Sequence, residues 1–272
     1  MSYYHHLIKF ALPPSYLLDT YSGGLLAFSL RKVSSSYIGS CIRVRRSSDN
    51  AELDIGFIGE DLDTVALLAF CGVSSGFVAK WYDQSGYANH ALQVSASVQP
   101  RIVLNGVLEV LDGTANPALV VYGGGVRFTL TSLVACSSEF TSVNVYRKIT
   151  SDETVGISGS GAPYPFLHFT GSQVLINTAG PAGIDFGNKS FPNNYIGISY
   201  KNGSNNGGVF FNGTRLGSEL ALGASVGNFQ YVLSRVGSGS SFKYSEAIFF
   251  NVNHLADMSP LFTNLNTYYG IY

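Results

Sequence analysis

The chain has 272 residues, of which 46% are hydrophobic, 13% aromatic and only 12% charged, with 16 Lys and Arg against 17 Asp and Glu. This composition excludes a disordered chain, which needs low hydrophobicity and high charge, and it lacks the basic excess of a nucleic-acid-binding protein. No run of about 18 apolar residues exists, so we expect no membrane insertion. The length suits one large all-β domain, or a domain with a small annex.

Residues 1–18 are aromatic, contain Pro13-Pro14 and predict an extended arm. They lack a basic segment followed by an apolar one, so we expect no secretory signal. The pair His5-His6 has no third ligand nearby, which argues against a metal site. We expect the arm to dock on a partner chain through Tyr3, Tyr4, His5, His6 and Phe10.

Residues 19–112 predict a first module. Alternation over residues 41–46 predicts a strand with arginines on one face. Residues 61–70 predict a helix, because Asp61 stands at the start, apolar residues recur at spacings of three and four, and Gly72 follows. Residues 77–82 predict a strand that runs into a turn at Asp83.

Residues 113–272 contain short apolar or alternating runs, each followed by Gly, Asn, Ser or Pro. Asn212-Gly213 between apolar runs predicts a β-hairpin. Three glycines at 123–125 lie between two runs and predict a tight turn, not a phosphate loop. A helix is expected over residues 256–269, after Asp257 and with Pro260 in its first turn. The predicted fold class is all-β, an antiparallel concanavalin A-like jelly-roll sandwich with short helices.

No cofactor or metal site is predicted. Cys41, Cys71 and Cys136 form an odd, widely spaced set, which predicts buried free thiols. No loop has the dense acidic spacing that calcium prefers.

Carboxylates for acid–base catalysis are scarce in residues 113–272. Glycoside hydrolysis needs two of them about 5–9 Å apart. We expect a solvated loop at Asp152-Glu153 and a helix cap at Asp257. Glu246 lies within a predicted strand, where a structural ion pair is favoured over a catalytic role. Asp185 and Glu139 have no supporting motif, and the five histidines stand in no nucleophile motif.

The arginine cluster at Arg43, Arg45 and Arg46 offers an anion site. The acidic residues that follow within about ten positions favour internal ion pairs instead; they are Asp49, Glu52 and Asp54.

Sugar recognition uses aromatic rings together with amide and acidic side chains. One stretch combines them, and its predicted carbohydrate-binding residues are Trp81, Tyr82, Asp83, Gln84, Asn89 and His90. The alternative is a buried aromatic strand followed by a turn that Asp83 stabilises.

Four stretches are similar to the catalytic domain of the α-L-arabinofuranosidase B family: residues 27–31 (AFSLR), 36–39 (SYIG), 42–49 (IRVRRSSD) and 81–91 (WYDQSGYANHA). The last resembles that family's YDQSG-x-x-NH segment. The same module occurs in bacteriophage virion proteins, ahead of a laminin-G or concanavalin A-like sandwich, and residues 43–57 look closer to the phage form. Residues 242–250 and 261–269 resemble the closing strand and helix of such sandwiches.

The fungal members of that family carry a nucleophile Glu, an acid/base Asp and an adjacent cysteine pair. By order along the chain, the two carboxylates would fall near residues 174–177 and 235–240, and neither stretch contains one. This chain also lacks vicinal cysteines. The resemblance therefore implies no catalytic residue at the matched positions.

These observations predict a non-enzymatic phage virion protein of a tail, baseplate or head appendage, assembled in the host cytoplasm and exposed on the particle. Its arm (1–18) would dock on other virion proteins, its module (19–112) would pack on the sandwich (113–272), and a homo-oligomer, most simply a trimer, would bind a host glycan. Two alternatives stay open: an arabinofuranosidase-like glycoside hydrolase, and a purely structural decoration protein without glycan affinity.

Overall fold

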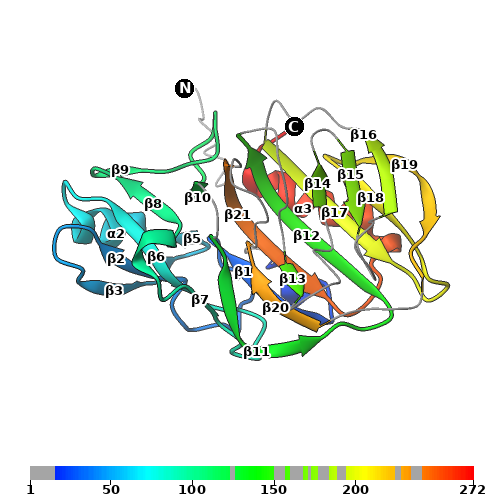
Figure 1. Cartoon of the computed structure of the whole chain (residues 1–272), viewed down its shortest axis with the longest axis horizontal. Helices are drawn as coiled ribbons and strands as arrows, with labels where there is room; N and C mark the ends of the chain where they lie inside the picture. The colour runs from blue at the N-terminus through cyan, green and yellow to red at the C-terminus, as the bar shows by residue number, and fades with distance from the viewer. Residues whose placement is uncertain are drawn as a thin grey trace, which may run out of the picture.

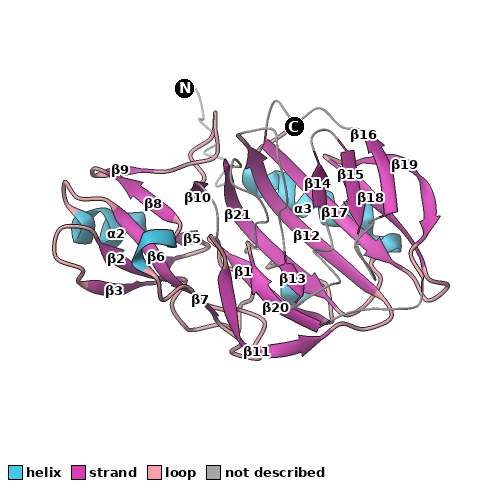
Figure 2. Ribbon diagram, viewed as in Figure 1, coloured by secondary structure: helices cyan, strands magenta, loops and turns pink. Residues whose placement is uncertain are grey.

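The computed structural model is an antiparallel β-sandwich with a few short helices (Figures 1 and 2). It describes residues 16–122, 126–149, 157–159, 168–170, 173–176, 184–188, 194–223, 228–233 and 241–272. The predicted docking residues Tyr3, Tyr4, His5, His6 and Phe10 lie outside these ranges, as do the glycines at 123–125.

The first part of the chain forms the blue-to-green elements of Figure 1. They are α1 (Leu17–Thr20), β1 (Gly24–Ser29), β2 (Ile42–Arg46), β3 (Glu52–Ile55), β4 (Phe57–Ile58), β5 (Asp61–Leu62), α2 (Thr64–Cys71), β6 (Gly76–Trp81), β7 (Ala91–Leu92), the 3-10 turn η1 (Ala96–Val98), β8 (Arg101–Leu104) and β9 (Val107–Leu108).

The remaining elements build most of the sandwich. They are β10 (Leu119–Tyr122), β11 (Phe128–Ala135), β12 (Phe140–Lys148), β13 (Ile157–Gly159), β14 (His168–Thr170), β15 (Gln173–Ile176), β16 (Ile184–Asn188), β17 (Asn194–Lys201), β18 (Asn206–Phe211), β19 (Thr214–Ala221), β20 (Asn228–Val232), β21 (Ser241–Phe250), the 3-10 turn η2 (Leu255–Asp257) and α3 (Met258–Tyr269).

Two local predictions can be compared directly with the structure. The predicted hairpin at Asn212-Gly213 is confirmed: β18 pairs with β19, and both turn residues have positive φ angles of 49° and 77°. The helix predicted over 61–70 begins later, at Thr64, because the carboxylate of Asp63 accepts the N–H of Ala66 at 2.8 Å and caps it. Asp61 instead belongs to β5, which pairs with β4.

The large sheet folds back on itself, so that strands near its β13 end pack against its central strands. Its strand order is β13-β20-β11-β7-β6-β8-β10-β21-β12-β17-β18-β19. β20 and β21 are not paired in this order, yet the rings of Phe229 and Phe249 lie 4.4 Å apart between them. β1 adds a further antiparallel pairing with β21, so the first described strand belongs to the sandwich. The domain boundary at residue 112 stays a prediction.

A bulge in β21 determines which way Glu246 faces. The pairing with β12 joins Glu246 to Val145 and Tyr244 to Tyr146, so Ser245 is an extra residue. Tyr244 and Ala247, three positions apart, both pack in the core between the layers. Because an extra residue reverses the alternation of sides, Glu246 shares the opposite face with Ile248, the face covered by α3.

Helix α3 covers this second face of the central strands, behind them in Figure 1. Leu261, Leu265 and Tyr269 of α3 are buried in the same cluster as Ile198 and Ile248 of the sheet. The central strands are therefore buried on both faces, which explains why β17 and β21 are almost continuously buried along their length.

The three cysteines are free and buried, as predicted. Within the described ranges, no three His, Cys, Asp or Glu side chains gather in a way that would hold a metal ion. None of the described helices is long and apolar enough to cross a membrane.

Replacing Leu265 by Ala should destabilise the fold by about 2–5 kcal/mol, because it leaves a cavity under α3. Urea unfolding followed by intrinsic fluorescence measures this. The control is Thr263→Ala on the exposed side of the same helix, for which a change of at most about 0.5 kcal/mol is expected. Equal losses in the two variants would contradict the packing described for α3.

Candidate functional site: a buried ion-pair network behind a surface of two loops

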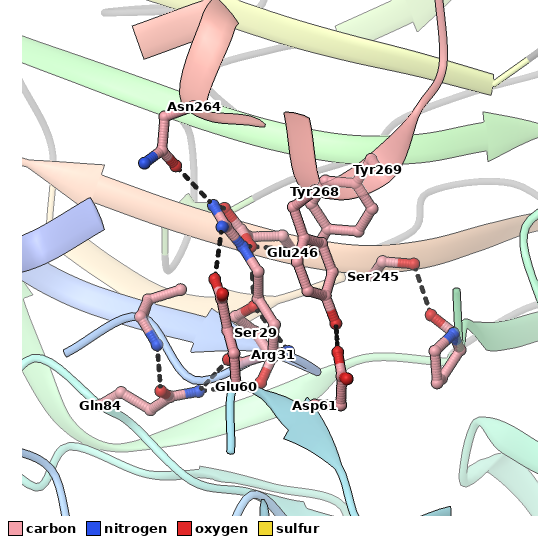
Figure 3. A network of polar contacts seen from close by, with 12 residues as sticks. Ser29, Arg31, Glu60, Asp61, Gln84, Ser245, Glu246, Asn264, Tyr268 and Tyr269 are labelled. Carbon is pink, nitrogen blue, oxygen red and sulfur yellow. Dashed lines mark hydrogen bonds and ion pairs between the residues drawn. The ribbon is translucent and has the colours of Figure 1, made fainter. Parts of the chain in front are cut away.

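A buried ion pair between Arg31 and Glu246 joins the end of β1 to β21 (Figure 3). The two side chains are 1% and 0% exposed, and Arg31 Nε donates to Glu246 Oε2 at 2.9 Å. The same oxygen accepts the hydroxyls of Ser29 and Tyr269 at 2.8 and 2.9 Å. The partners of Glu246 thus come from β1, from the segment that follows it and from α3.

Each nitrogen of the Arg31 guanidinium also donates a hydrogen bond. Nη1 donates to Glu60 at 3.0 Å, Nη2 donates to Asn264 at 3.1 Å, and the group lies 4.9 Å from the ring centre of Tyr268 (Figure 3). Burial alone would lower the pKa of Arg31, but Glu246, Tyr269 and Glu60 together outweigh it and raise that pKa. Burial also raises the pKa of Glu60, against the opposing effect of Arg31. The pair is a structural clamp with no room for a substrate.

Gln84 connects this clamp to the surface. Its Nε2 donates to the carbonyls of Ser29 and Arg31 at 2.9 and 3.0 Å, and its Oε1 accepts the N–H of Val33 at 2.9 Å (Figure 3). Gln84 therefore satisfies three backbone groups where β1 ends and the chain turns into residues 34–40. A buried backbone segment without such partners would be costly.

Asp83 holds the next loop, residues 85–90. One carboxylate oxygen accepts the N–H groups of Ala27 and Ser85, and the other accepts the Ser85 hydroxyl and the Asn89 N–H, all at 2.7–3.1 Å. Burial raises the pKa of Asp83 although these bonds favour its charged form. The residue shapes the loop instead of facing solvent.

His90 closes the loop. Its Nδ1 accepts the N–H of Asp83 at 3.2 Å, so the neutral ring carries its proton on Nε2. Burial first, and the nearby Lys80 second, lower the pKa of His90. The ring packs edge-on against Tyr82 at 4.9 Å and lines a surface hollow. At neutral pH His90 is a hydrogen-bond donor without charge.

The predicted carbohydrate-binding residues thus divide into two groups. Trp81 is 0% exposed and packs between Phe28 and Phe128, while Asp83, Gln84 and Asn89 are buried and fully used in the loop scaffold. Tyr82 is only part-buried, but its hydroxyl donates to Asp54. Of the six predicted residues, His90 lines a surface hollow and also keeps a polar atom, Nε2, that has no hydrogen-bond partner among the described residues. The structure of this segment agrees with the alternative prediction, a buried aromatic strand followed by a turn that Asp83 stabilises.

The surface in front of the scaffold carries four hollows around residues 34–40 and 85–90. The largest, about 530 Å³, lies beside Tyr37, Ile38 and Phe57. Three others of about 390, 230 and 230 Å³ share the loop of residues 86–88 as a wall. Sequence reasoning missed Tyr87, Ile38 and Arg31 here. An exposed ring such as Tyr87 has no periodicity to mark it, and Arg31 has a partner 215 positions away.

Other predicted roles are settled by ion pairs. Arg43 pairs with Asp54 at 2.7 Å and Arg46 with Asp49 at 2.6 Å, which confirms internal pairing over anion binding. The structural role predicted for Glu246 is also confirmed. Asp257 stands at the start of α3, but its carboxylate accepts no helix N–H and pairs with His254 at 2.8 Å.

The remaining sandwich carboxylates differ in surroundings. Asp185 is exposed on β16 and accepts the N–H of Gly187 at 2.8 Å. Glu219 on β19 accepts the amide of Asn202 at 2.6 Å. Asp152, Glu153 and the stretch 235–240 lie outside the described residues.

Comparison with known proteins points to one family. Residues 24–127 match the family model described as "Alpha-L-arabinofuranosidase B, catalytic". An arabinofuranosidase solved with arabinofuranosyl-α-1,2-xylobiose has a TM-score of 0.66 at 14% identity, covering 93% of this chain and 64% of its own. A GH54 α-L-arabinofuranosidase soaked with a cyclic sulfate inhibitor has a TM-score of 0.64 at 15% identity, covering 96% and 66%. This chain thus spans about two thirds of the solved proteins that it resembles. No curated protein matches it.

These findings correct the functional prediction made from the sequence. The resemblance to a phage virion protein was wrong: both the family model and the similar structures are arabinofuranosidases. The prediction of a non-enzymatic tail or decoration protein is overturned with it. Its reason was the lack of carboxylates at two matched stretches, but sequence order alone poorly locates a catalytic group when identity is only 14–15%.

Replacing Glu246 by Gln should lower the free energy of unfolding by about 3–5 kcal/mol, because the charge of Arg31 then stays buried with weaker compensation. Urea unfolding at pH 7 provides the measurement. The control is Asp54→Asn, which removes a part-exposed pair with Arg43 and should cost about 0–1 kcal/mol. A loss of that small size for Glu246→Gln would show that the clamp contributes little.

His90 should titrate below its ordinary pKa of 6.5, since burial and Lys80 disfavour its charged form. A histidine whose pKa is depressed by folding contributes stability that is present above the unfolded value and is lost as pH falls through the folded value. NMR titration of the His90 ring protons measures this, with His90→Gln used for assignment. A midpoint at or above 6.5 would contradict the neutral, donor form of His90.

Proposed function

We propose that this chain is an arabinofuranosidase-like glycoside hydrolase. The observation that carries the proposal is the match of residues 24–127 to a model of an arabinofuranosidase catalytic domain. Its support is the likeness in fold, which extends over 93% of the chain and so reaches well past the matched residues. A solved relative was complexed with arabinofuranosyl-α-1,2-xylobiose, which suggests a furanoside as the substrate to test first.

Asp185 is the carboxylate that we assign to the chemistry. Glu246 is fully buried in the clamp, whereas Asp185 is exposed on a strand that pairs with residues 173–176. The resemblance stated above put the nucleophile strand of the family near residues 174–177. In the register of the three-stranded sheet, Asp185 lies directly opposite Leu175 of β15. The carboxylate would then stand one strand away from its expected place.

The reaction that follows is a two-step displacement. A carboxylate oxygen of Asp185 bonds to the anomeric carbon as the glycosidic C–O bond breaks, and the leaving oxygen takes a proton from a second acid. Water then attacks the same carbon, gives a proton to the conjugate base of the second acid, and releases the sugar and the free carboxylate. Asp152 and Glu153 supply further carboxylates in the sequence.

Several finer statements stay predictions. They are the concanavalin A-like jelly-roll type of the sandwich, the trimer, and the docking role of residues 1–18.

The purified chain should release 4-nitrophenol from 4-nitrophenyl α-L-arabinofuranoside, a ligand of one solved relative. Asp185→Asn should lower kcat by at least about 100-fold. Glu219→Gln, an exposed carboxylate on β19, is the matched control and should leave kcat unchanged. In Asp185→Gly, sodium azide should restore turnover and yield the arabinosyl azide, because azide replaces the missing nucleophile.

A wild-type chain that releases no nitrophenol between pH 4 and 8 would overturn the hydrolase. Wild-type activity with an unaffected Asp185→Asn would keep the hydrolase and reject Asp185 as its nucleophile.

A further inference from the structure

Residues 86–88 form the common wall of three surface hollows. Gly86 and Tyr87 line the hollow of about 390 Å³, Gly86 and Ala88 line one of about 230 Å³, and Tyr87 and Ala88 line the other of about 230 Å³. The opposite walls come from residues 18–25, 34–39 and 131–134. The loop therefore stands between separate depressions of the same surface.

Tyr87 is the exposed aromatic residue of this wall. Its side chain is 67% exposed, and it lines two of the three hollows. No described residue hydrogen-bonds its hydroxyl. An aromatic face is electron-rich, so it attracts the C–H bonds on the apolar face of a sugar ring.

The loop that carries Tyr87 is held rigidly. Asp83 accepts backbone N–H groups from Ser85 and Asn89 on either side of Tyr87. The amide of Asn89 in turn ties the loop to β11 by donating to the carbonyl of Ser132 and accepting the hydroxyl of Thr131. Ala88 has a φ of 54°, a conformation that costs energy in a residue with a Cβ and that concentrates at binding sites.

The chemistry of the hollows favours a neutral ligand. Among the described residues that line these three hollows there is no Lys or Arg, so they offer no cationic side chain to an anionic ligand. The carboxylates present, Asp19 and Asp83, are already bonded to loop N–H groups and hydroxyls. Serine and threonine hydroxyls and the neutral His90 remain as the polar groups, the set that suits sugar hydroxyls.

We propose that Tyr87 and the hollows on either side of it form a binding site for a neutral polysaccharide, separate from the catalytic carboxylate. Asp185 lies on β16, and no described residue of the three-stranded sheet lines these hollows. The choice of arabinoxylan as the polymer rests on the proposed function, whereas the neutral character of the ligand rests on the surface itself. The site holds the polymer by stacking, while hydrolysis occurs elsewhere.

Affinity electrophoresis of the full chain through gels that contain soluble arabinoxylan tests this site without using activity. Wild-type protein should be retarded, and Tyr87→Ala should lose at least about tenfold in affinity, because it removes the aromatic face on which the sugar stacks. Tyr87→Phe should bind as wild type because it keeps the ring. The matched control is Tyr122→Ala, another exposed tyrosine, which stacks on Arg101 and lines none of these hollows.

Turnover of the small 4-nitrophenyl substrate separates the two proposals. All three tyrosine variants should keep wild-type kcat and KM on it. Wild-type retardation without turnover would reject the hydrolase and leave the binding site standing. Turnover with no retardation of the wild-type protein, or with Tyr87→Ala retarded as strongly as wild type, overturns the binding site. A loss for Tyr122→Ala equal to that for Tyr87→Ala overturns it as well.

Discussion

The ion pair between Arg31 and Glu246 is the contact on which the arrangement of the two parts of the chain depends. A charge pair removed from water is expensive, and it persists only when every oxygen and N–H has a partner. Here those partners come from β1, from the turn before β5, from β21 and from α3. The elements that meet at Arg31 are thus held in one relative position by a single buried cation.

The bulge at Ser245 makes this pair possible. Without the extra residue, Glu246 would share the inner face with Tyr244 and would place a carboxylate among the aromatic rings between the layers. With it, the carboxylate meets α3 and β1. Ser245 itself donates to the carbonyl of Pro117 and accepts the N–H of Leu30, so the irregular residue has its own partners.

The same contact reaches the surface through Gln84, which bonds to the carbonyl of Arg31. The segment of residues 81–90, which the sequence predicts as a sugar site, is therefore largely a scaffold for the loop that carries Tyr87. Buried Trp81, Asp83 and Gln84 precede this loop and position it, and Tyr87 within the loop is 67% exposed. A polar motif with few free hydrogen-bonding atoms is better suited to shaping a surface than to binding with its own side chains.

Patterns of local origin were predictable from the sequence, and long-range ones were not. The Asn212-Gly213 hairpin, the buried cysteines and the Arg43–Asp54 pair all arise from nearby residues or from burial preference. The bulge at Ser245 and the partners of Arg31 depend on strand register, which a single sequence does not reveal. The scarcity of carboxylates along the chain was a poor guide to function for a related reason, because catalysis depends on where the fold brings the few that exist.

The proposed hydrolase activity depends on one nucleophilic carboxylate, Asp185. Covalent labelling tests this assignment most directly. An arabinofuranose-configured cyclic sulfate, the inhibitor class soaked into a solved relative, opens when a carboxylate attacks its anomeric carbon and keeps the sulfate on the sugar. Intact-protein mass spectrometry should show one added reagent per chain, and peptide mapping should place it on Asp185. A protein that gains no mass, or whose label lies on another residue, would contradict the assignment of Asp185 as the nucleophile.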